Sequence, residues 1–277
     1  MTILIVGGSG FLGTELVRQA AAAGHATAAT FATRTRPGSA PKVSWHALDL
    51  RDLDRIEAVM ADVEPRVVVN ATSGGPDWTV TAEGPARLAM AAARHASRLV
   101  HVSSDAVFSG ARVHYDESRL PDPLTPYGAA KAAAETGIRL VNPGAVVART
   151  SLIIGDQRSD HVRAVHELAA GTRTGVLFTD DVRCPVHVAD LAAALLELAS
   201  SDRSGVHHLA GADPVSRHEL GMLIARRDGL DASRLPAGLR ADSALPGALD
   251  VRLDSRATQE RLRTRLRGAR EFLAPGT

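Results

Sequence analysis

Residues 7–13 decide the fold, and they run Gly7-Gly8-Ser9-Gly10-Phe11-Leu12-Gly13. Gly7, Gly10 and Gly13 recur every third residue, between an apolar run at residues 3–6 and a helical stretch at 11–23. Glycine permits a tight turn, lets the backbone approach a pyrophosphate, and lets the helix pack closely on the strand. Free N–H groups at the helix start favour phosphate oxygens. The spacing therefore predicts a dinucleotide-binding loop, with expected contacts from Gly7, Gly10, Phe11, Leu12 and Gly13.

Short apolar runs and longer helical stretches alternate around this loop. We expect strands at residues 3–6, about 26–31, 66–70, 98–103 and 144–149. We expect helices between them at residues 11–23, 52–62, 79–96 and 125–141. This alternation predicts an α/β fold of the Rossmann type, a doubly wound parallel sheet covered by helices on both faces.

The second half of the chain has weaker periodicity. Residues 160–170, 187–200, 216–229 and 254–266 are expected to be helical, and residues 235–251 to be loop. Ligands of open parallel sheets bind at the carboxyl ends of the strands, so a lobe formed late in the chain should close over that edge. We therefore expect a nucleotide-binding domain at 1–150 and about 184–204, with a smaller substrate-binding lobe at about 151–183 and 205–277.

Composition limits the class of partner. The 277 residues are 45% hydrophobic but only 3% aromatic, and their formal net charge is +1. These values do not favour a nucleic-acid partner, which requires a basic surface or aromatic stacking platforms. The chain opens directly on a strand, with no basic leader or long apolar segment, so a cytoplasmic protein without membrane contact is expected. A single cysteine, Cys184, forms no intrachain disulfide and is expected to be a buried filler rather than a reactive thiol.

The segment after the second expected strand indicates which nicotinamide nucleotide fits. It runs Ala32-Thr33-Arg34-Thr35-Arg36 and contains no acidic residue. An NAD site usually places Asp or Glu here to hold the ribose 2′-hydroxyl. Arg34 or Arg36 can instead clamp a 2′-phosphate, with the hydroxyl of Thr33 beside them, although a solvated basic loop is the alternative. We expect NADP(H) to be favoured over NAD(H).

Two further segments follow expected strands at the same sheet edge. Asp49 and Leu50 come after the third strand, where they are expected to touch the adenine. Asn70, Ala71 and Thr72 come after the fourth, where they are expected to lie near the ribose. Both expectations rest on position along the chain alone.

A tyrosine and a lysine lie four residues apart near the start of the helix expected at 125–141. Tyr127 and Lys131 therefore share one helix face. A free phenol titrates near pH 10, and a nearby ammonium favours its ionised form. We expect Tyr127 and Lys131 to contact the cofactor, with Tyr127 exchanging a proton with a carbonyl oxygen as hydride is transferred.

The strand expected at 98–103 leads into Ser103-Ser104-Asp105. A serine at the carboxyl edge of a strand can bond a substrate oxygen and fix its geometry. We choose Ser104 for this catalytic role, with Ser103 as the alternative, and expect Asp105 to contact substrate as well. None of the eleven histidines forms a convincing metal-binding pattern, so no metal site is expected.

These pieces resemble one family, the extended short-chain dehydrogenase/reductases, and within it the dTDP-4-dehydrorhamnose reductase group. The matching stretches follow the family's order over residues 1–200, namely Gly7–Gly13, Ser103–Phe108, Tyr127–Lys131, Arg149–Gly155 and Pro185–Leu191. The resemblance implies a catalytic triad of Ser104, Tyr127 and Lys131. It also implies hydride transfer to a keto group of a nucleotide-linked deoxysugar, a small-molecule substrate, by a protein that can form a homodimer.

The chain departs from the family's pattern in places that bear on the reaction. Ala106 follows Asp105, where the reductases usually carry an aromatic residue and the related dehydratases a glutamate. An NAD(P)-dependent epimerase and a non-catalytic NADP-binding subunit or sensor remain alternatives. Some reductases of the group bind magnesium at a dimer contact, and here Glu15 alone suggests such a ligand.

The resemblance also implies a substrate contact from Arg183, which lies where the family has the wall of the sugar-nucleotide pocket. A guanidinium there can hold a substrate diphosphate through two hydrogen bonds. The alternative is a salt bridge to Asp180 or Asp181.

Overall fold

The computed structural model describes residues 1–33 and 43–275. Arg34 and Arg36, which the sequence assigns to a 2′-phosphate, lie outside these described residues. Among the helices of the described residues, none is long and apolar enough to cross a membrane.

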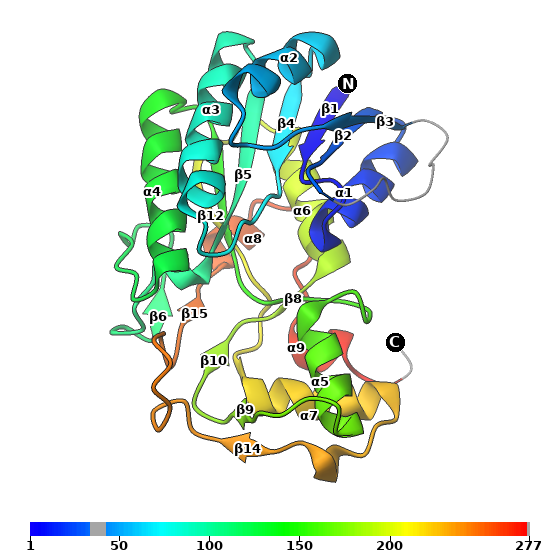
Figure 1. The fold of residues 1–277 in the computed structure, drawn as a ribbon, viewed down its shortest axis with the longest axis vertical. Helices are drawn as coiled ribbons and strands as arrows, with labels where there is room; N and C mark the ends of the chain where they lie inside the picture. Colours follow the sequence, from blue (N-terminus) through cyan, green and yellow to red (C-terminus); the bar gives the residue numbers. More distant parts are fainter. Residues whose placement is uncertain (34–42, 276–277) are drawn as a thin grey trace.

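Seven parallel strands form the central sheet, in the order β12-β7-β5-β4-β1-β2-β3 (Figure 1). Their bounds are β1 Thr2–Val6, β2 Ala26–Phe31, β3 Val43–Ala47, β4 Val67–Asn70, β5 Arg98–Ser104, β7 Val146–Thr150 and β12 Gly205–Leu209. The winding direction reverses between β1 and β4, which is where Rossmann sheets bind nucleotides. The predicted fold class is confirmed.

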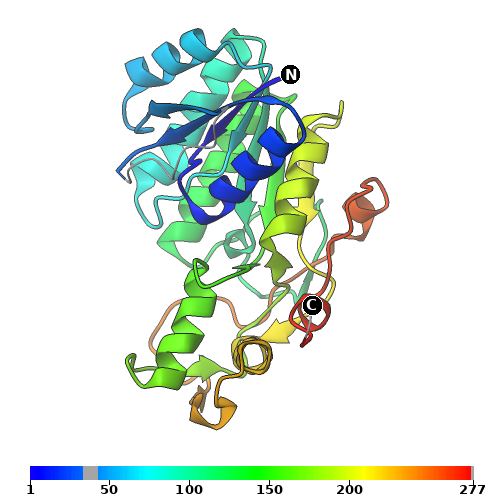
Figure 2. The same cartoon turned by 90° about the vertical axis from the view of Figure 1, so that its right-hand side faces the viewer.

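Helices cover both faces of the sheet, as Figures 1 and 2 show. They are α1 Phe11–Ala22 and α6 Val188–Ala199 on one face, and α2 Leu53–Val63, α3 Gly84–Arg94 and α4 Pro126–Val141 on the other. Ile5 and Leu16 belong to the first buried core, and Leu4, Leu88 and Ile138 to the second. The β1 strand is buried on both faces because its successive side chains point to opposite helix layers.

A smaller lobe lies beyond the carboxyl ends of the strands, at the bottom of Figure 1. Its helices are α5 Asp160–Ala170, α7 Arg217–Asp228 and α9 Ala269–Phe272, with short strands β8 Ile153–Ile154, β9 Leu177–Phe178, β10 Val182–Arg183, β13 Val215–Ser216 and β14 Ala237–Gly238. Leu168, Leu220 and Leu273 lie in a separate buried core of this lobe. The remaining short elements are β6 His114–Tyr115, β11 Val186–His187, β15 Arg252–Leu253, α8 Arg256–Gln259, the π-helix η1 Thr79–Glu83, and the 3₁₀ helices η2 Asp105–Val107 and η3 Ala232–Arg234.

Two sequence predictions need correction. The predicted lobe segment 205–277 overlaps the sheet, because β12 pairs in parallel with β7 from Gly205 to Leu209. The helix predicted at 254–266 is limited to the four residues of α8. The Gln259 side chain bonds the backbone of Thr264 and Leu266, and Glu197 accepts from the backbone of Arg263 and Thr264. These side chains form hydrogen bonds with backbone groups that would bond to one another within a longer helix.

Candidate active site

One cavity of about 1010 Å³ brings the predicted residues together where the sheet faces the smaller lobe. Its lining includes all of the following predicted residues: Gly7, Gly10, Phe11, Leu12, Thr33, Asp49, Leu50, Ala71, Thr72, Ser104, Asp105, Tyr127, Lys131 and Arg183. Of the predicted residues that the structure describes, Gly13 and Asn70 do not border it. A cavity of this size lies at the upper end of the usual range for ligand pockets.

The glycine loop has the shape of a phosphate cradle. Gly7 has a φ of +83°, a backbone conformation that residues with a side chain rarely adopt. At Gly13, a Cβ atom would lie only 2.1 Å from the Gly7 carbonyl oxygen. Helix α1 begins after Gly10 without a side-chain cap and without an acidic residue in its first turn. Its first N–H groups are therefore free for an anion at the positive end of the helix dipole. These features fit the pyrophosphate of a dinucleotide.

The strand register places the expected ribose contacts beside this loop. Ala71 donates its backbone N–H to Val6, and the Gly7 N–H bonds the Thr30 hydroxyl. Asn70 is 1% exposed and turned inward, where its carbonyl oxygen accepts from the backbone and hydroxyl of Thr72. Asn70 therefore positions Thr72 instead of facing the cavity.

Tyr127 enters the site because α4 starts close to the turn after β5. Thr125 caps α4 by accepting from the Gly128 N–H, and Pro126 occupies the first turn, where a missing N–H costs nothing. A Cβ at Gly128 would lie 2.1 Å from the carbonyl oxygen of Ala106. Only glycine allows this approach, which brings the Tyr127 hydroxyl into hydrogen bonds with Ser104 and Ser73.

The proton chemistry of the pair differs from the sequence expectation. Burial raises the pKa of Tyr127, the hydrogen bonds from Ser104 and Ser73 oppose this shift, and Asp105 adds to it. The Lys131 ammonium instead donates to the backbone carbonyls of Val102, at 2.9 Å, and Thr72, at 3.4 Å. The phenol therefore stays protonated at neutral pH, as a proton donor requires.

Lys131 is itself strongly affected by its surroundings. Burial lowers the pKa of Lys131 to about 8, while the Glu135 carboxylate one helical turn away opposes this shift. The ammonium form consequently predominates at pH 7. A buried titratable group beside a cavity is a frequent property of catalytic sites.

Hydrogen bonding favours Ser104 over Ser103. Both border the cavity, but the Ser103 hydroxyl donates to Glu135 at 2.6 Å in the interior. The Ser104 hydroxyl hydrogen-bonds Tyr127 at the cavity, accepts from the Ala106 N–H at 3.2 Å and makes only a long bond, of 3.3 Å, to Asp105 Oδ1. Ser104 is therefore the serine available to a substrate oxygen.

A buried ion pair lies between α4 and the sheet, next to the cavity residues. Arg149 on β7 and Glu135 on α4 have side chains 1% and 2% exposed, with Nη2 and Oε2 2.7 Å apart. Arg149 also donates to the Arg119 carbonyl and lies 5.0 Å from the centre of the Phe108 ring. The pair ties α4 to the sheet, one turn from Lys131.

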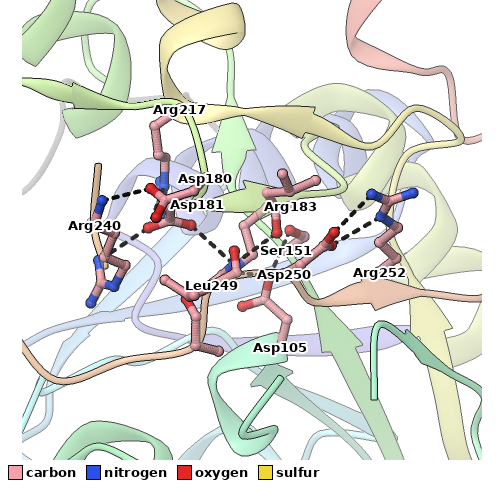
Figure 3. Close-up of polar contacts among 12 residues, drawn as sticks. Asp105, Ser151, Asp180, Asp181, Arg183, Arg217, Arg240, Leu249, Asp250 and Arg252 are labelled. Carbon is pink, nitrogen blue, oxygen red and sulfur yellow. Dashed lines mark hydrogen bonds and ion pairs between the residues drawn. The ribbon is translucent and has the colours of Figure 1, made fainter. Parts of the chain in front are cut away.

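Asp105 and Arg183 lie together on the lobe side of the cavity (Figure 3). Asp105 accepts from Ser151 at 2.7 Å, and its carboxylate is 3.8 Å from Arg183 Nε. Arg183 Nη1 lies 3.0 Å from Asp181. The alternative salt bridge to Asp181 is therefore present, and a substrate contact for Arg183 stays a prediction.

Two further expectations concern reactive and metal-binding groups. Cys184 is buried with Val107, Phe108 and Tyr115, and burial raises its pKa to about 12, which leaves an unreactive thiol. Glu15 accepts from Arg18 and Gln19. Within residues 1–33 and 43–275, no three His, Cys, Asp or Glu side chains gather in a way that can hold a metal ion.

The structure adds lining residues that sequence reasoning missed. They include Ser73, Ser151, His161, Arg217 and Arg240, together with Arg158. Ser73 directly follows the predicted ribose segment, so extending that segment by one residue would have found it. Ser151 lies in the stretch Arg149–Gly155 that resembles the family. The others come from the lobe, where no motif in the sequence marks them.

Comparison with known proteins shows the family to which the chain belongs. The sequence model of the RmlD substrate binding domain matches residues 1–273. The dTDP-4-dehydrorhamnose reductase of Mycobacterium tuberculosis is 32% identical over 84% of this chain and 77% of its own length. A probable low-salt glycan biosynthesis reductase, Agl14 of Haloferax volcanii, is 28% identical over 90% of this chain and 87% of its own length.

Solved structures share the fold. The dTDP-4-dehydrorhamnose reductase of Bacillus anthracis, determined in complex with NADP, superposes with a TM-score of 0.84. It is 19% identical, and the match covers 98% of this chain and 96% of that one. At this identity the likeness shows the fold alone.

Proposed function

Because this chain belongs to the family of RmlD substrate binding domains, we propose that it is a reductase that transfers hydride from NADPH to a keto group of a nucleotide-linked deoxysugar. An oxidoreductase activity is supported by the relatives named dTDP-4-dehydrorhamnose reductase. The observation that supports the proposal most strongly is one cavity lined by both the glycine cradle and the set Ser104, Tyr127 and Lys131.

The residues of the cavity have complementary roles in this reaction. NADPH, when bound, supplies the hydride. Ser104 hydrogen-bonds the substrate oxygen and Tyr127 gives it a proton, which its raised pKa makes available at neutral pH. Lys131 is held by the Val102 carbonyl and contributes a positive charge next to the developing alkoxide.

Two parts of the chain bind the two ligands in this reaction. Residues 1–150 and about 184–204 bind the nucleotide, and 151–183 with the later segments form the substrate lobe. Asp105 then contacts the sugar from the turn after β5. NADPH and sugar nucleotides are metabolites of the cytoplasm, so we also propose that the protein works there.

The test is direct. The purified protein is incubated with NADPH and a panel of nucleotide-linked 4-keto sugars, and the loss of NADPH absorbance is followed. We expect NADPH oxidation that requires both the protein and one of these sugars. An epimerase of the same fold would convert its substrate without net consumption of NADPH.

We further propose that NADPH is preferred over NADH because Arg34 or Arg36 binds the 2′-phosphate. A charge-assisted hydrogen bond contributes about 1.5–3 kcal/mol, so NADPH should bind about ten- to a hundredfold more tightly than NADH. Replacing both arginines with alanine should weaken NADPH binding to the level of NADH and leave NADH binding unchanged. Titration of both nucleotides onto the wild type and the double variant checks this prediction. Equal affinities of the wild type for NADPH and NADH would contradict it.

A further inference from the structure

One buried carboxylate on the lobe side of the cavity is shared by three arginines (Figure 3). Asp181 is 1% exposed, and it contacts Arg183 on β10, Arg217 at the start of α7, and Arg240 after β14. The neighbouring Asp180 does not compete for them, because its carboxylate accepts the backbone N–H groups of Arg240 and Ala241. The three arginines differ in how many donors remain free.

The terminal hydrogen-bond donors of Arg183 are occupied by acceptors within the protein. Its Nη1 donates to the carbonyls of Val182 and Leu249, and its Nη2 donates to Ala248. Its Nε faces Asp105 at 3.8 Å. Arg183 therefore binds the segment 248–249 to β10 and has little left to offer a substrate.

Arg240 is held in a similar way. Its Nη1 contacts Asp181 at 3.1 Å, its Nη2 donates to the Pro246 carbonyl, and its guanidinium lies 5.6 Å from the centre of the Phe178 ring. Its Nε is buried and has no hydrogen-bond partner among the described residues, but protein atoms enclose it and keep it from a ligand. These contacts fix the loop that forms the cavity's outer wall.

Arg217 is different. Its backbone N–H bonds the Asp181 carbonyl, and its Nε lies 3.4 Å from the Asp181 carboxylate. Its two terminal nitrogens have no partner in the part of the chain that the structure describes, and its side chain is 25% exposed at the cavity wall. His161 lies in the same wall, and burial lowers its pKa to about 4, so the imidazole is neutral and adds no positive charge beside Arg217.

We propose that Arg217 binds a phosphate group of the nucleotide-linked substrate, with Asp181 as the positioning residue that aims its guanidinium. This inference rests on the proposed function, which supplies a substrate with a diphosphate. The planar guanidinium presents two parallel donors to phosphate oxygens, and a neighbouring carboxylate that holds Nε fixes the plane of the fork. The substrate's phosphate would then meet α7, across the cavity from the glycine cradle.

The experiment uses dTDP and UDP as probes, titrated onto the NADPH-saturated protein by calorimetry. Arg217→Gln should weaken binding of the better probe by about ten- to a hundredfold, without changing NADPH affinity. Arg226→Gln removes the same charge from an exposed position on the same helix and should leave binding unchanged. Asp181→Asn should also weaken binding of the probe. Arg217→Lys should retain only part of the wild-type affinity, because an ammonium lacks the two parallel donors of the guanidinium.

The outcomes separate this inference from the proposed function. If the wild type binds dTDP or UDP and Arg217→Gln binds it within twofold of wild type, Arg217 is structural and the inference fails alone. A fall in thermal stability with unchanged probe affinity has the same meaning. If the wild type binds neither probe, the inference and the sugar-nucleotide substrate both fail. With a turned-over substrate, the inference requires KM to rise in Arg217→Gln while kcat stays near wild type.

Discussion

Replacing Tyr127 with phenylalanine is expected to lower turnover by about 10²–10⁴-fold, the usual contribution of a positioned proton donor. The ring stays in place, so the cavity keeps its shape and only the hydroxyl that meets Ser104 and Ser73 is lost. Folding and NADPH binding should be retained. Steady-state kinetics and a nucleotide titration on the same preparation measure both effects.

The chain's other tyrosine provides a matched control. Tyr115 is 2% exposed, stacks on Phe108, and accepts the Arg112 N–H at 3.0 Å, but it does not border the cavity. Tyr115→Phe should cost about 1 kcal/mol of stability for one lost hydrogen bond and leave turnover nearly intact. Near-normal turnover in Tyr127→Phe would mean that another group supplies the proton.

The second large effect concerns stability. Glu135→Ala is expected to reduce the free energy of unfolding by about 3–5 kcal/mol, because it leaves Arg149 charged, buried and unpaired. It also removes the acceptor of the Ser103 hydroxyl. Urea unfolding followed by circular dichroism measures the change.

An exposed pair serves for comparison. Arg265 and Glu271 are 2.7 Å apart with side chains 74% and 42% exposed, and such pairs contribute about 0–1 kcal/mol. Glu271→Ala should therefore have a small effect. If the two variants lost similar stability, burial would not be what makes the Glu135–Arg149 pair important.

The first half of the fold and the meeting of Ser104, Tyr127 and Lys131 in one cavity were predictable because each depends on local rules. Glycine spacing, strand length and the separation of Tyr127 from Lys131 depend on a few neighbouring residues, and the structure brings them into one cavity. Ser104 was preferred from the sequence by its position, but the physical reason required the fold, because Glu135, which accepts from the Ser103 hydroxyl, is 32 residues away from Ser103. The adenine and ribose assignments stay predictions.

The substrate side could not be predicted from local patterns. Arg183 lies just before the stretch Pro185–Leu191 that resembles the family, but the carbonyls of Ala248 and Leu249 occupy its donors. Those carbonyls lie 65 and 66 residues further along the chain. Arg217 belongs to no sequence motif. Its free donors can be recognised only in the structure, where Asp181 contacts its side chain through Nε alone. The raised pKa of Tyr127 has a similar origin, since burial is a property of the whole fold.

The central claim, hydride transfer from NADPH to a nucleotide-linked keto sugar, is tested most directly with NADPH that carries deuterium at its transferable position. The protein is incubated with this cofactor and a dTDP-linked 4-keto-6-deoxysugar, and the products are analysed by mass spectrometry and NMR. The account predicts one deuterium at the new alcohol carbon for each NADP⁺ formed, and loss of this signal in Tyr127→Phe. NADPH that binds but stays unoxidised with every sugar of the panel would contradict it and indicate a non-catalytic NADP-binding subunit or sensor.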